Sequence, residues 1–153
     1  MTKKTIFIGA DSAGYELKEI LKKKMMDAGY DVNDVGCDST ASCHYPIFAS
    51  AVSTAVQEDM ENRLGILICG TGIGMSMCAN KYNGIRAAVC SDTFSARMTR
   101  IHNNANVLCM GARVIGQCLA EDILDAFLTA EFEDGGRHRQ RVDMMTDIEN
   151  SQK

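Results

Sequence analysis

The residues Leu64-Gly-Ile-Leu-Ile-Cys69, followed directly by Gly70-Thr-Gly-Ile-Gly74, carry the strongest structural signal in the sequence. The first six residues are almost all apolar, which predicts a strand buried on both faces of a parallel sheet. The glycines that follow let the backbone turn tightly into a helix and point several N–H groups at one spot. This unit of strand, turn and helix predicts an α/β protein with an anion-binding turn.

On both sides of this stretch, short apolar runs alternate with segments of helical periodicity. The pattern predicts further strands at residues 5–10, 32–35, 85–90 and 105–110, a loop at 36–46, and helices at 15–28, 47–59, 117–132 and after Gly135-Gly136. Five strands alternating with helices predict a three-layer, doubly wound (Rossmann-like) domain with a five-stranded parallel sheet. Because the sequence contains neither a repeat nor a linker, we expect residues 1–153 to form a single domain.

Composition and charge exclude several classes of protein. The chain has 153 residues, of which 46% are hydrophobic and 24% charged, which is typical of a globular protein rather than a disordered one. The net charge of −4 argues against nucleic-acid binding. No apolar run approaches the ~20 residues of a membrane span, and the N-terminal apolar stretch is too short for a signal peptide. Seven cysteines without a Cys-x-x-Cys pair predict reduced thiols, mostly in the core, and a cytoplasmic location.

The chemistry is expected beyond the carboxyl ends of the strands, where ligands bind in such sheets. The glycine-rich turn matches neither common nucleotide motif: Met75 replaces the third glycine of Gly-x-Gly-x-x-Gly, and no P-loop Lys-Ser/Thr follows. Cys69 stands at its start, and a thiol that faces a helix N-terminus is stabilised as a thiolate. Cys69 is therefore a candidate base or nucleophile. The alternatives are a redox sensor and a turn that is only a tight connection.

His102 ends a helix that begins near Asp92, and a histidine there is ordinarily a cap that interacts with the helix dipole. A helix of about ten residues carries the chain ~15 Å back from the carboxyl edge. A catalytic His102 would therefore have to come from a second subunit. Arg137 and Arg141 share one helix face and fit either a solvated basic surface or a phosphate, with Arg113 as a third candidate. The three histidines lack metal-ligand spacing, so no metal site is expected.

Together these residues resemble the ribose-5-phosphate isomerase type B family, which includes the two subunits of galactose-6-phosphate isomerase. The resemblance covers nearly the whole chain. Its motifs are Gly9-Ala-Asp11 with Gly14, Tyr45-Pro46, residues 65–74, Ala79-Asn-Lys81, Gly84-Ile-Arg-Ala87, His102-Asn-Asn-Ala-Asn106, and Gly135-Gly-Arg-His138 with Arg141. It implies an aldose–ketose isomerase of sugar phosphates that uses no metal or organic cofactor. It also implies a homodimer, or a dimer of dimers, whose active sites are shared between chains.

The resemblance implies roles for individual residues as well. Cys69 would move the proton between C1 and C2, Thr71 would help to hold the enediolate, and the partner's His102 would assist ring opening. The remaining residues would bind substrate: the N–H groups of the turn hold the enediolate, polar side chains hold sugar hydroxyls, and arginines hold the phosphate. These residues are Asp11, Ser12, Tyr45, Gly70, Gly72, Gly74, Asn103, Arg113, Arg137 and Arg141.

Ribose 5-phosphate is the expected substrate and ribulose 5-phosphate the product. Two departures keep a hexose 6-phosphate isomerase, acting on galactose or allose 6-phosphate, as the alternative. Many pentose-phosphate members have His where this chain has Ser12, and Asp-Tyr-Pro where it has His44-Tyr45-Pro46. These segments look like galactose-6-phosphate isomerase subunits, although Cys69, His102 and both arginines make the chain look self-sufficient. An alternative of another class is a non-catalytic module that binds a phosphorylated ligand.

Overall fold

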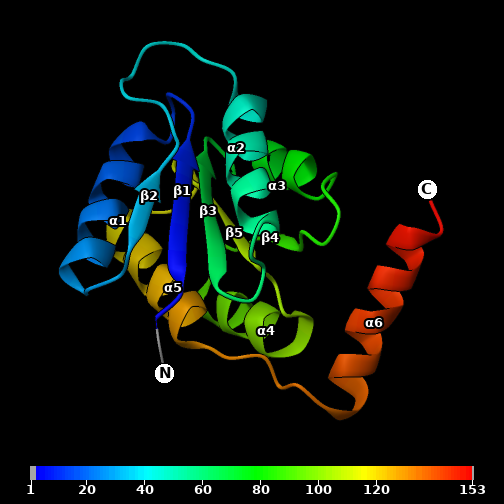
Figure 1. Ribbon diagram of the computed structural model, residues 1–153. Helices are drawn as coiled ribbons and strands as arrows, with labels where there is room; N and C mark the ends of the chain where they lie inside the picture. Colours follow the sequence, from blue (N-terminus) through cyan, green and yellow to red (C-terminus); the bar gives the residue numbers. More distant parts are fainter. Residues whose placement is uncertain (1–2, 153) are drawn as a thin grey trace.

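The computed structural model describes residues 3–152 and has the expected α/β architecture, a parallel sheet between two layers of helices (Figure 1). The strand order is β2-β1-β3-β5-β4, with β1 (Thr5–Ala10), β2 (Val32–Asp34), β3 (Arg63–Cys69), β4 (Ala87–Val89) and β5 (Val107–Gly111). The helices are α1 (Tyr15–Asp27), α2 (Tyr45–Gln57), α3 (Ile73–Ala79), α4 (Thr93–Asn103), α5 (Gln117–Thr129) and α6 (Gly136–Asn150). The predicted five-stranded parallel sheet is thus confirmed, with β3 at its centre.

The central strand β3 builds both hydrophobic cores. Ile66 and Ile68 point to the face covered by α1, α4 and α5, whereas Leu67 and Cys69 point to the face covered by α2 and α3. All four side chains are at most 5% exposed. Full burial of a large aliphatic side chain contributes about 1.5–3 kcal/mol. The uninterrupted apolar sequence of β3 follows from burial on both faces.

Several elements differ in their bounds from the sequence expectation; β5, for example, begins at Val107 rather than at residue 105. Helix α5 ends at Thr129 rather than at residue 132, because the chain leaves the helix to cross α4, where the Glu133 N–H donates to the Ile101 carbonyl at 3.0 Å. Helix α2 begins two residues early, at Tyr45, because Pro46 fits the first helical turn, where its missing N–H costs nothing. Strand β4 pairs only over Ala87–Val89.

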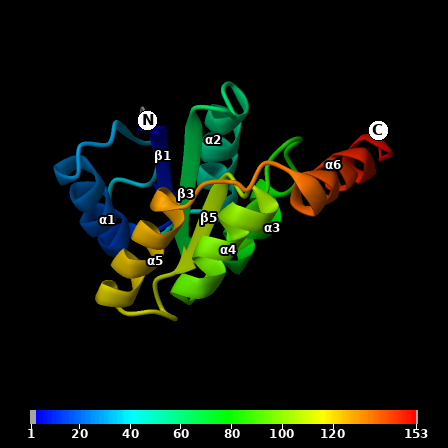
Figure 2. The same ribbon diagram turned by 90° about the horizontal axis from the view of Figure 1, so that it is seen from below.

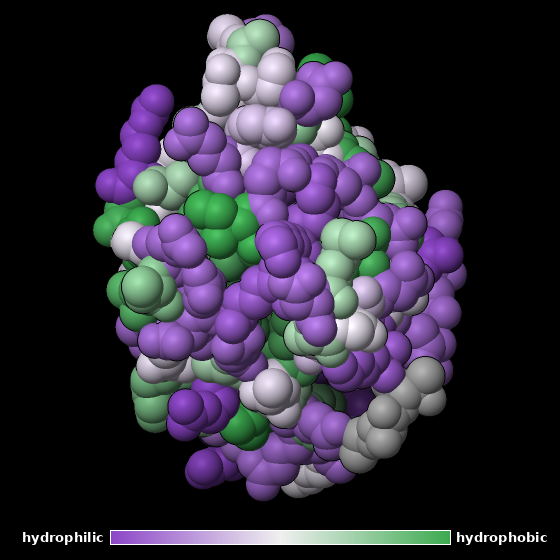
Figure 3. All heavy atoms as spheres, turned by 90° about the vertical axis from the view of Figure 1, so that its left-hand side faces the viewer, coloured by the Kyte–Doolittle hydropathy of each residue, from purple (hydrophilic) through white to green (hydrophobic). Residues whose placement is uncertain are grey.

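Helix α6 stands apart from the sheet (Figures 1 and 2) and buries only His138 and Val142. Its outer half exposes Met144, Met145 and Ile148, at 56%, 38% and 63%. The opposite side of the molecule, around α1 and β2, is mostly hydrophilic, with small separate hydrophobic spots (Figure 3). The apolar surface of α6 is therefore left without a partner within residues 3–152.

None of the helices within residues 3–152 combines the length and the apolar character that a membrane crossing requires.

Candidate active site

Cys69 ends β3 and lies beneath the glycine-rich turn, with 5% of the residue exposed. The N–H of Gly72 donates a hydrogen bond to the Cys69 Sγ at 3.1 Å. Gly72 has a φ of 77°, and a Cβ there would lie 2.9 Å from the Met110 carbonyl carbon, so only glycine fits this close approach. The Cys69 sulfur therefore faces the glycine-rich turn and accepts a hydrogen bond from its backbone.

Burial raises the pKa values of two other core thiols, those of Cys90 and Cys109. All seven cysteines are free. Complete burial, followed by the neighbouring Cys69 and Cys90 thiols, raises the pKa of Cys109 well above its usual value. Burial raises the pKa of Cys90 to about 11. Cys109 and Cys90 are therefore ordinary protonated core thiols near neutral pH.

The turn after Cys69 keeps free hydrogen-bond donors. Within residues 3–152, the N–H groups of Gly70, Thr71 and Gly74 make no hydrogen bond, whereas the N–H of Gly72 is taken by the sulfur. The Thr71 side chain is exposed, and its hydroxyl accepts the Ile73 N–H at 3.3 Å. The donors left for an anionic ligand are therefore those of Gly70, Thr71 and Gly74.

Tyr45 and Arg113 border this turn. A Cβ added at Gly74 would lie 2.7 Å from the Tyr45 ring, so the ring lies directly against the turn. A Cβ at Gly70 would lie 3.5 Å from the Arg113 Nη1. The Arg113 N–H donates to the Gly70 carbonyl at 3.0 Å, which fastens the segment after β5 to the turn. The structure thus brings Cys69, the turn, Tyr45 and Arg113 together.

Asp11 lies at the same edge of the sheet, because Ala10 pairs with Ile68 and the Asp11 N–H donates to the Ile68 carbonyl at 3.3 Å. Its Oδ1 accepts the N–H groups of Ala13 at 3.0 Å and Gly14 at 3.2 Å. One carboxylate oxygen therefore shapes the turn into α1, which leaves Oδ2 for a ligand. Ser12 beside it is partly exposed.

Four predicted site residues lie away from this cluster. His102 and Asn103 end α4 at the amino edge of the sheet, five residues or fewer before β5, whose last residue, Gly111, pairs with Cys69. The five residues of β5 span about 16 Å between the two edges. Arg137 and Arg141 are on α6, are exposed, and form no ion pair within residues 3–152. His102 therefore lies far from Cys69 of its own chain, as the length of the helix led us to expect.

His138 is a residue that the sequence analysis did not assign to the site. Its ring stacks on that of His102, with centroids 4.3 Å apart and planes 7° from parallel. Burial, then the charges of His102 and of the neighbouring arginines, lowers the pKa of His138, and these effects outweigh the opposing effect of Glu133. A neutral imidazole therefore supports His102 near neutral pH. The available signal was its place in the Gly135-Gly-Arg-His138 motif.

His102, Glu133 and His138 also place potential metal-ligand atoms within 4.8 Å of one another, although their spacing in the sequence predicted no metal site. Parallel stacked rings direct their nitrogen lone pairs side by side rather than toward one point. The arrangement is better described as a stacked histidine pair than as a metal centre.

Sequence comparisons relate the chain to sugar-phosphate isomerases. The family model described as Ribose/Galactose Isomerase matches residues 6–145. Ribose-5-phosphate isomerase B of Escherichia coli (strain K12) is 48% identical over 146 residues, which cover 95% of this chain and 97% of that protein. D-erythrulose-4-phosphate isomerase of Pectobacterium atrosepticum is 49% identical, with coverage of 86% and 87%. Galactose-6-phosphate isomerase subunit LacA of Streptococcus equi subsp. zooepidemicus is 44% identical, with coverage of 92% and 96%.

Solved structures agree with these relatives. Ribose-5-phosphate isomerase B of Clostridium thermocellum superimposes with a TM-score of 0.93 at 46% identity, covering 97% of this chain and 99% of that one. The Mycoplasma genitalium enzyme with bound ribulose-5-phosphate has a TM-score of 0.93 at 39% identity, with coverage of 98% and 99%. The family model, the related sequences and the solved structures agree over nearly the full length of the chain. This chain therefore belongs to the ribose/galactose isomerase family.

Proposed function

We propose that this member of the family interconverts ribose 5-phosphate and ribulose 5-phosphate, with Cys69 as the base. The aldose–ketose class of reaction follows from family membership. The observation that carries the finer proposal is the Cys69 sulfur, which lies at the carboxyl edge under the Gly72 N–H at 3.1 Å. Tyr45 and Arg113 border the same turn.

The reaction needs one base that can collect a proton at C2 and return it at C1. The Cys69 thiolate takes the C2 proton of the open-chain aldose, and the electron pair moves into the C1 carbonyl to give an enediolate. The thiol then returns the proton to C1, while the C2 hydroxyl proton passes to O1 and the C2 carbonyl forms. The free N–H groups of Gly70 and Gly74 and the Thr71 hydroxyl would stabilise the negative oxygen, at about 3 kcal/mol for each well-placed donor.

A second copy of the chain would complete the site. His102 and Asn103 lie at the opposite edge of the sheet from Cys69 of the same chain. The apolar stripe of Met144, Met145 and Ile148 on α6 gives a second copy a surface to cover. In such a dimer, His102 would open the sugar ring as a general acid, and Asn103 would position the substrate.

Three arginines would bind the phosphate of the substrate. Arg137 and Arg141 lie on one face of α6 and, like Arg113, form no ion pair within residues 3–152, so their guanidinium groups are free to bind an anion. The phosphate is remote from C1 and C2, and its binding energy would fix the position of those carbons relative to the sulfur.

The relatives favour a small sugar phosphate but leave its length open. D-erythrulose-4-phosphate isomerase and a galactose-6-phosphate isomerase subunit are similar to this chain at 49% and 44% identity. Asp11 and Ser12 would bind the sugar, and the Ser12 side chain, which is shorter than the histidine of many pentose-phosphate members, would leave room for a longer substrate. A hexose 6-phosphate is therefore the second candidate.

The test is kcat/KM of the purified chain on erythrulose 4-phosphate, ribose 5-phosphate and galactose 6-phosphate. We expect the highest value on ribose 5-phosphate, and a clear preference for the four- or six-carbon sugar contradicts that assignment. Cys69→Ala should lower kcat at least about 10³-fold with the fold retained, whereas Cys109→Ala should keep kcat. Undiminished turnover by Cys69→Ala would exclude the thiol as base.

A further inference from the structure

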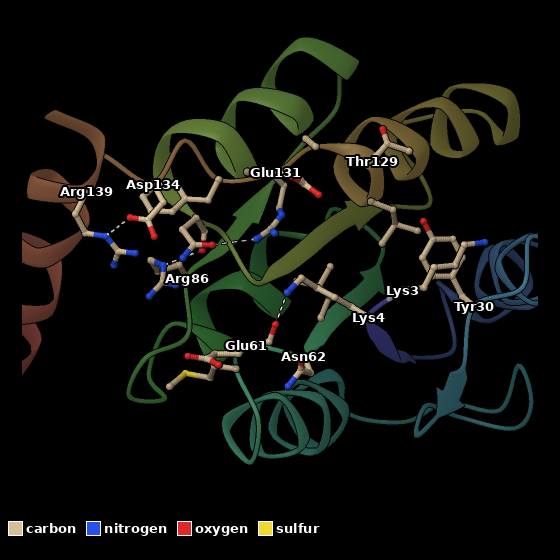
Figure 4. A pocket seen from close by; sticks show the side chains of 17 residues that line it. Lys3, Lys4, Tyr30, Glu61, Asn62, Arg86, Thr129, Glu131, Asp134 and Arg139 are labelled. Carbon is tan, nitrogen blue, oxygen red and sulfur yellow. Dashed lines mark hydrogen bonds and ion pairs between the residues drawn. The ribbon is translucent and has the colours of Figure 1, made fainter. Parts of the chain in front are cut away.

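An open cavity of about 950 Å³ lies at the amino ends of the strands, across the sheet from Cys69 (Figure 4). The starts of β1 and β3, the segments before β4 and β5, and the chain between α5 and α6 form its walls. Its charged lining residues are Lys3, Lys4, Glu61, Arg86, Arg100, Glu131, Asp134 and Arg139. None of them belongs to the proposed isomerase site.

Arg100 brings a buried and incompletely paired guanidinium to this cavity. The residue is 5% exposed, and its Nε has no hydrogen-bond partner. Its Nη1 donates to the Ala105 carbonyl and, at 3.2 Å, to the Asn104 Oδ1. A buried donor without an acceptor is rare and destabilising in a folded protein. An acceptor in the cavity would remove this cost.

Arg86 adds a second cation that forms no close ion pair within residues 3–152, although Glu149 attracts it from a greater distance. Its Nε donates to the Asn104 carbonyl at 2.9 Å, and within residues 3–152 neither Arg86 nor Arg100 forms an ion pair. Burial, then the positive charge of Arg86, lowers the pKa of Arg100. Two neighbouring guanidinium groups therefore repel each other in a poorly solvated place, which an anion between them would relieve.

The remaining charges leave the cavity positive. Asp134 is neutralised by Arg139, whose Nε lies 2.6 Å from the Asp134 Oδ1. Lys3, Lys4, Arg86 and Arg100 then share the cavity lining with the carboxylates of Glu61 and Glu131. Glu149, which is not a lining residue, attracts Arg86 from outside the cavity. Figure 4 shows Arg86 toward one end of the cavity, Glu131 near its middle and the Tyr30 ring at the other end.

We propose that this cavity binds a small phosphorylated metabolite whose phosphate is held by Arg86 and Arg100. A phosphate dianion accepts several charge-assisted hydrogen bonds from guanidinium groups. The volume is that of a metabolite site rather than of a single inorganic ion. The Tyr30 ring, which has the Lys3 Nζ 4.6 Å from its centroid, would lie beside the organic part of the ligand.

Occupancy of this cavity would act on the end of α4. Asn104 accepts hydrogen bonds from both Arg86 and Arg100, and it directly follows His102 and Asn103. An anion that draws the two guanidinium groups toward the cavity would shift the residue that ends the helix. This coupling to catalysis rests on the proposed function, whereas binding in the cavity does not.

Binding can be followed with a single fluorophore, because the chain has no tryptophan. Tyr30→Trp is introduced into the Cys69→Ala chain, which does not consume sugar phosphates under the proposed mechanism. The ligands tested are inorganic phosphate, ribose 5-phosphate and adenosine 5′-monophosphate, with ribose as the uncharged control. We expect a saturable fluorescence change with the phosphate esters and none with ribose. If no phosphate compound saturates the fluorescence change up to about 10 mM, the proposal is overturned. If inorganic phosphate binds as tightly as both esters, the cavity recognises only the phosphate, and the assignment of a metabolite as its ligand is wrong.

Charge variants test the location of the phosphate. Arg86→Gln should weaken binding at least about tenfold, whereas Arg97→Gln, which removes the same charge from an exposed position of α4, should change it less than about twofold. Glu131→Gln should tighten binding, because it removes a competing anion. If Arg86→Gln does not fold, Lys4→Gln replaces it, with weaker binding expected. If the cavity variants bind the phosphate esters with the same affinity as the parent chain, the proposed location of the phosphate is wrong.

Discussion

A methyl group at position 74 would compete directly with the Tyr45 ring for space. A Cβ there would lie 2.7 Å from two ring carbons and 3.1 Å from the Tyr45 hydroxyl oxygen. Tyr45 starts α2 and is 39% exposed, so the added methyl group would turn the ring away from the glycine-rich turn toward solvent. Gly74 therefore matters for the contact between the turn and α2.

Gly74→Ala should displace Tyr45 and lower kcat/KM about 10- to 100-fold, because small displacements of positioning groups are costly in catalysis. Gly116→Ala is the matched control, since a Cβ at Gly116 meets nothing within 4 Å. Steady-state kinetics of the two variants, with thermal unfolding to compare their stability, give the answer. Equal kcat/KM for both variants contradicts a role of the Tyr45 contact.

At the scale of elements, α6 is joined to α4 by the stacked rings of His138 and His102. The low pKa of His138, caused by burial and by the nearby cations, keeps the supporting ring neutral near pH 7. A neutral ring supports His102 through its flat face, and phenylalanine offers a similar face.

His138→Phe should therefore keep most of the turnover of ribose 5-phosphate, whereas His138→Ala should lose about tenfold or more. The loss of turnover should be confined to the furanose form of the substrate, because His102 acts only in ring opening. Initial rates with ribulose 5-phosphate, which is open-chain, should change little. A His138→Ala variant that slows both directions equally points to a general structural role instead.

A second pair of elements, α1 and β2, is joined by a partly buried ion pair. Lys18, 1% exposed, donates to Asp34, which also accepts from Lys22 at 2.7 Å. Burial alone would raise the pKa of Asp34, but the hydrogen bonds from Lys18 and Lys22 outweigh it and lower that pKa. The stabilisation is therefore present above pH ~4, the unfolded-state value, and is lost as the pH falls through the lower folded-state pKa.

Asp34→Asn should reduce the free energy of unfolding by about 2 kcal/mol at pH 7, less than is typical of a broken buried pair because Glu19 still holds Lys18. Urea unfolding at pH 7 and pH 3 should show this difference shrinking at the lower pH. Asp27→Asn, which removes a pair whose side chains are 77% and 64% exposed, should cost about 0.5 kcal/mol or less. A difference between Asp34→Asn and the parent that grows in acid would reverse the assigned sign.

Elements with strong local signals were predictable, and contacts between them were not. The bounds of β1 match the apolar run at residues 5–10, and β3 follows from its uninterrupted apolar sequence. The stack of His102 on His138 joins residues 36 positions apart through the path of the chain between α5 and α6, which no local pattern encodes. The Arg86 and Arg100 cavity depends likewise on tertiary packing.

At the scale of the whole molecule, the two halves of the proposed site belong to opposite edges of the sheet. Cys69 and its turn lie at the carboxyl edge, and His102 ends α4 at the amino edge. A C2 dimer can bring the two edges of different chains together twice. Each chain then supplies one half of each of two sites.

Mixing inactive Cys69→Ala and His102→Ala chains under conditions of subunit exchange should therefore restore activity. Random pairing gives half heterodimers, each with one intact site of two, so about a quarter of the parent activity is expected. A mixture of Cys69→Ala with Thr71→Ala is the control, because both changes affect the same half and no heterodimer has an intact site. Native mass spectrometry measures the heterodimer fraction. Heterodimers that form in both mixtures without activity in the first would contradict the shared site, because a site built within one chain would be damaged in each subunit of the heterodimer.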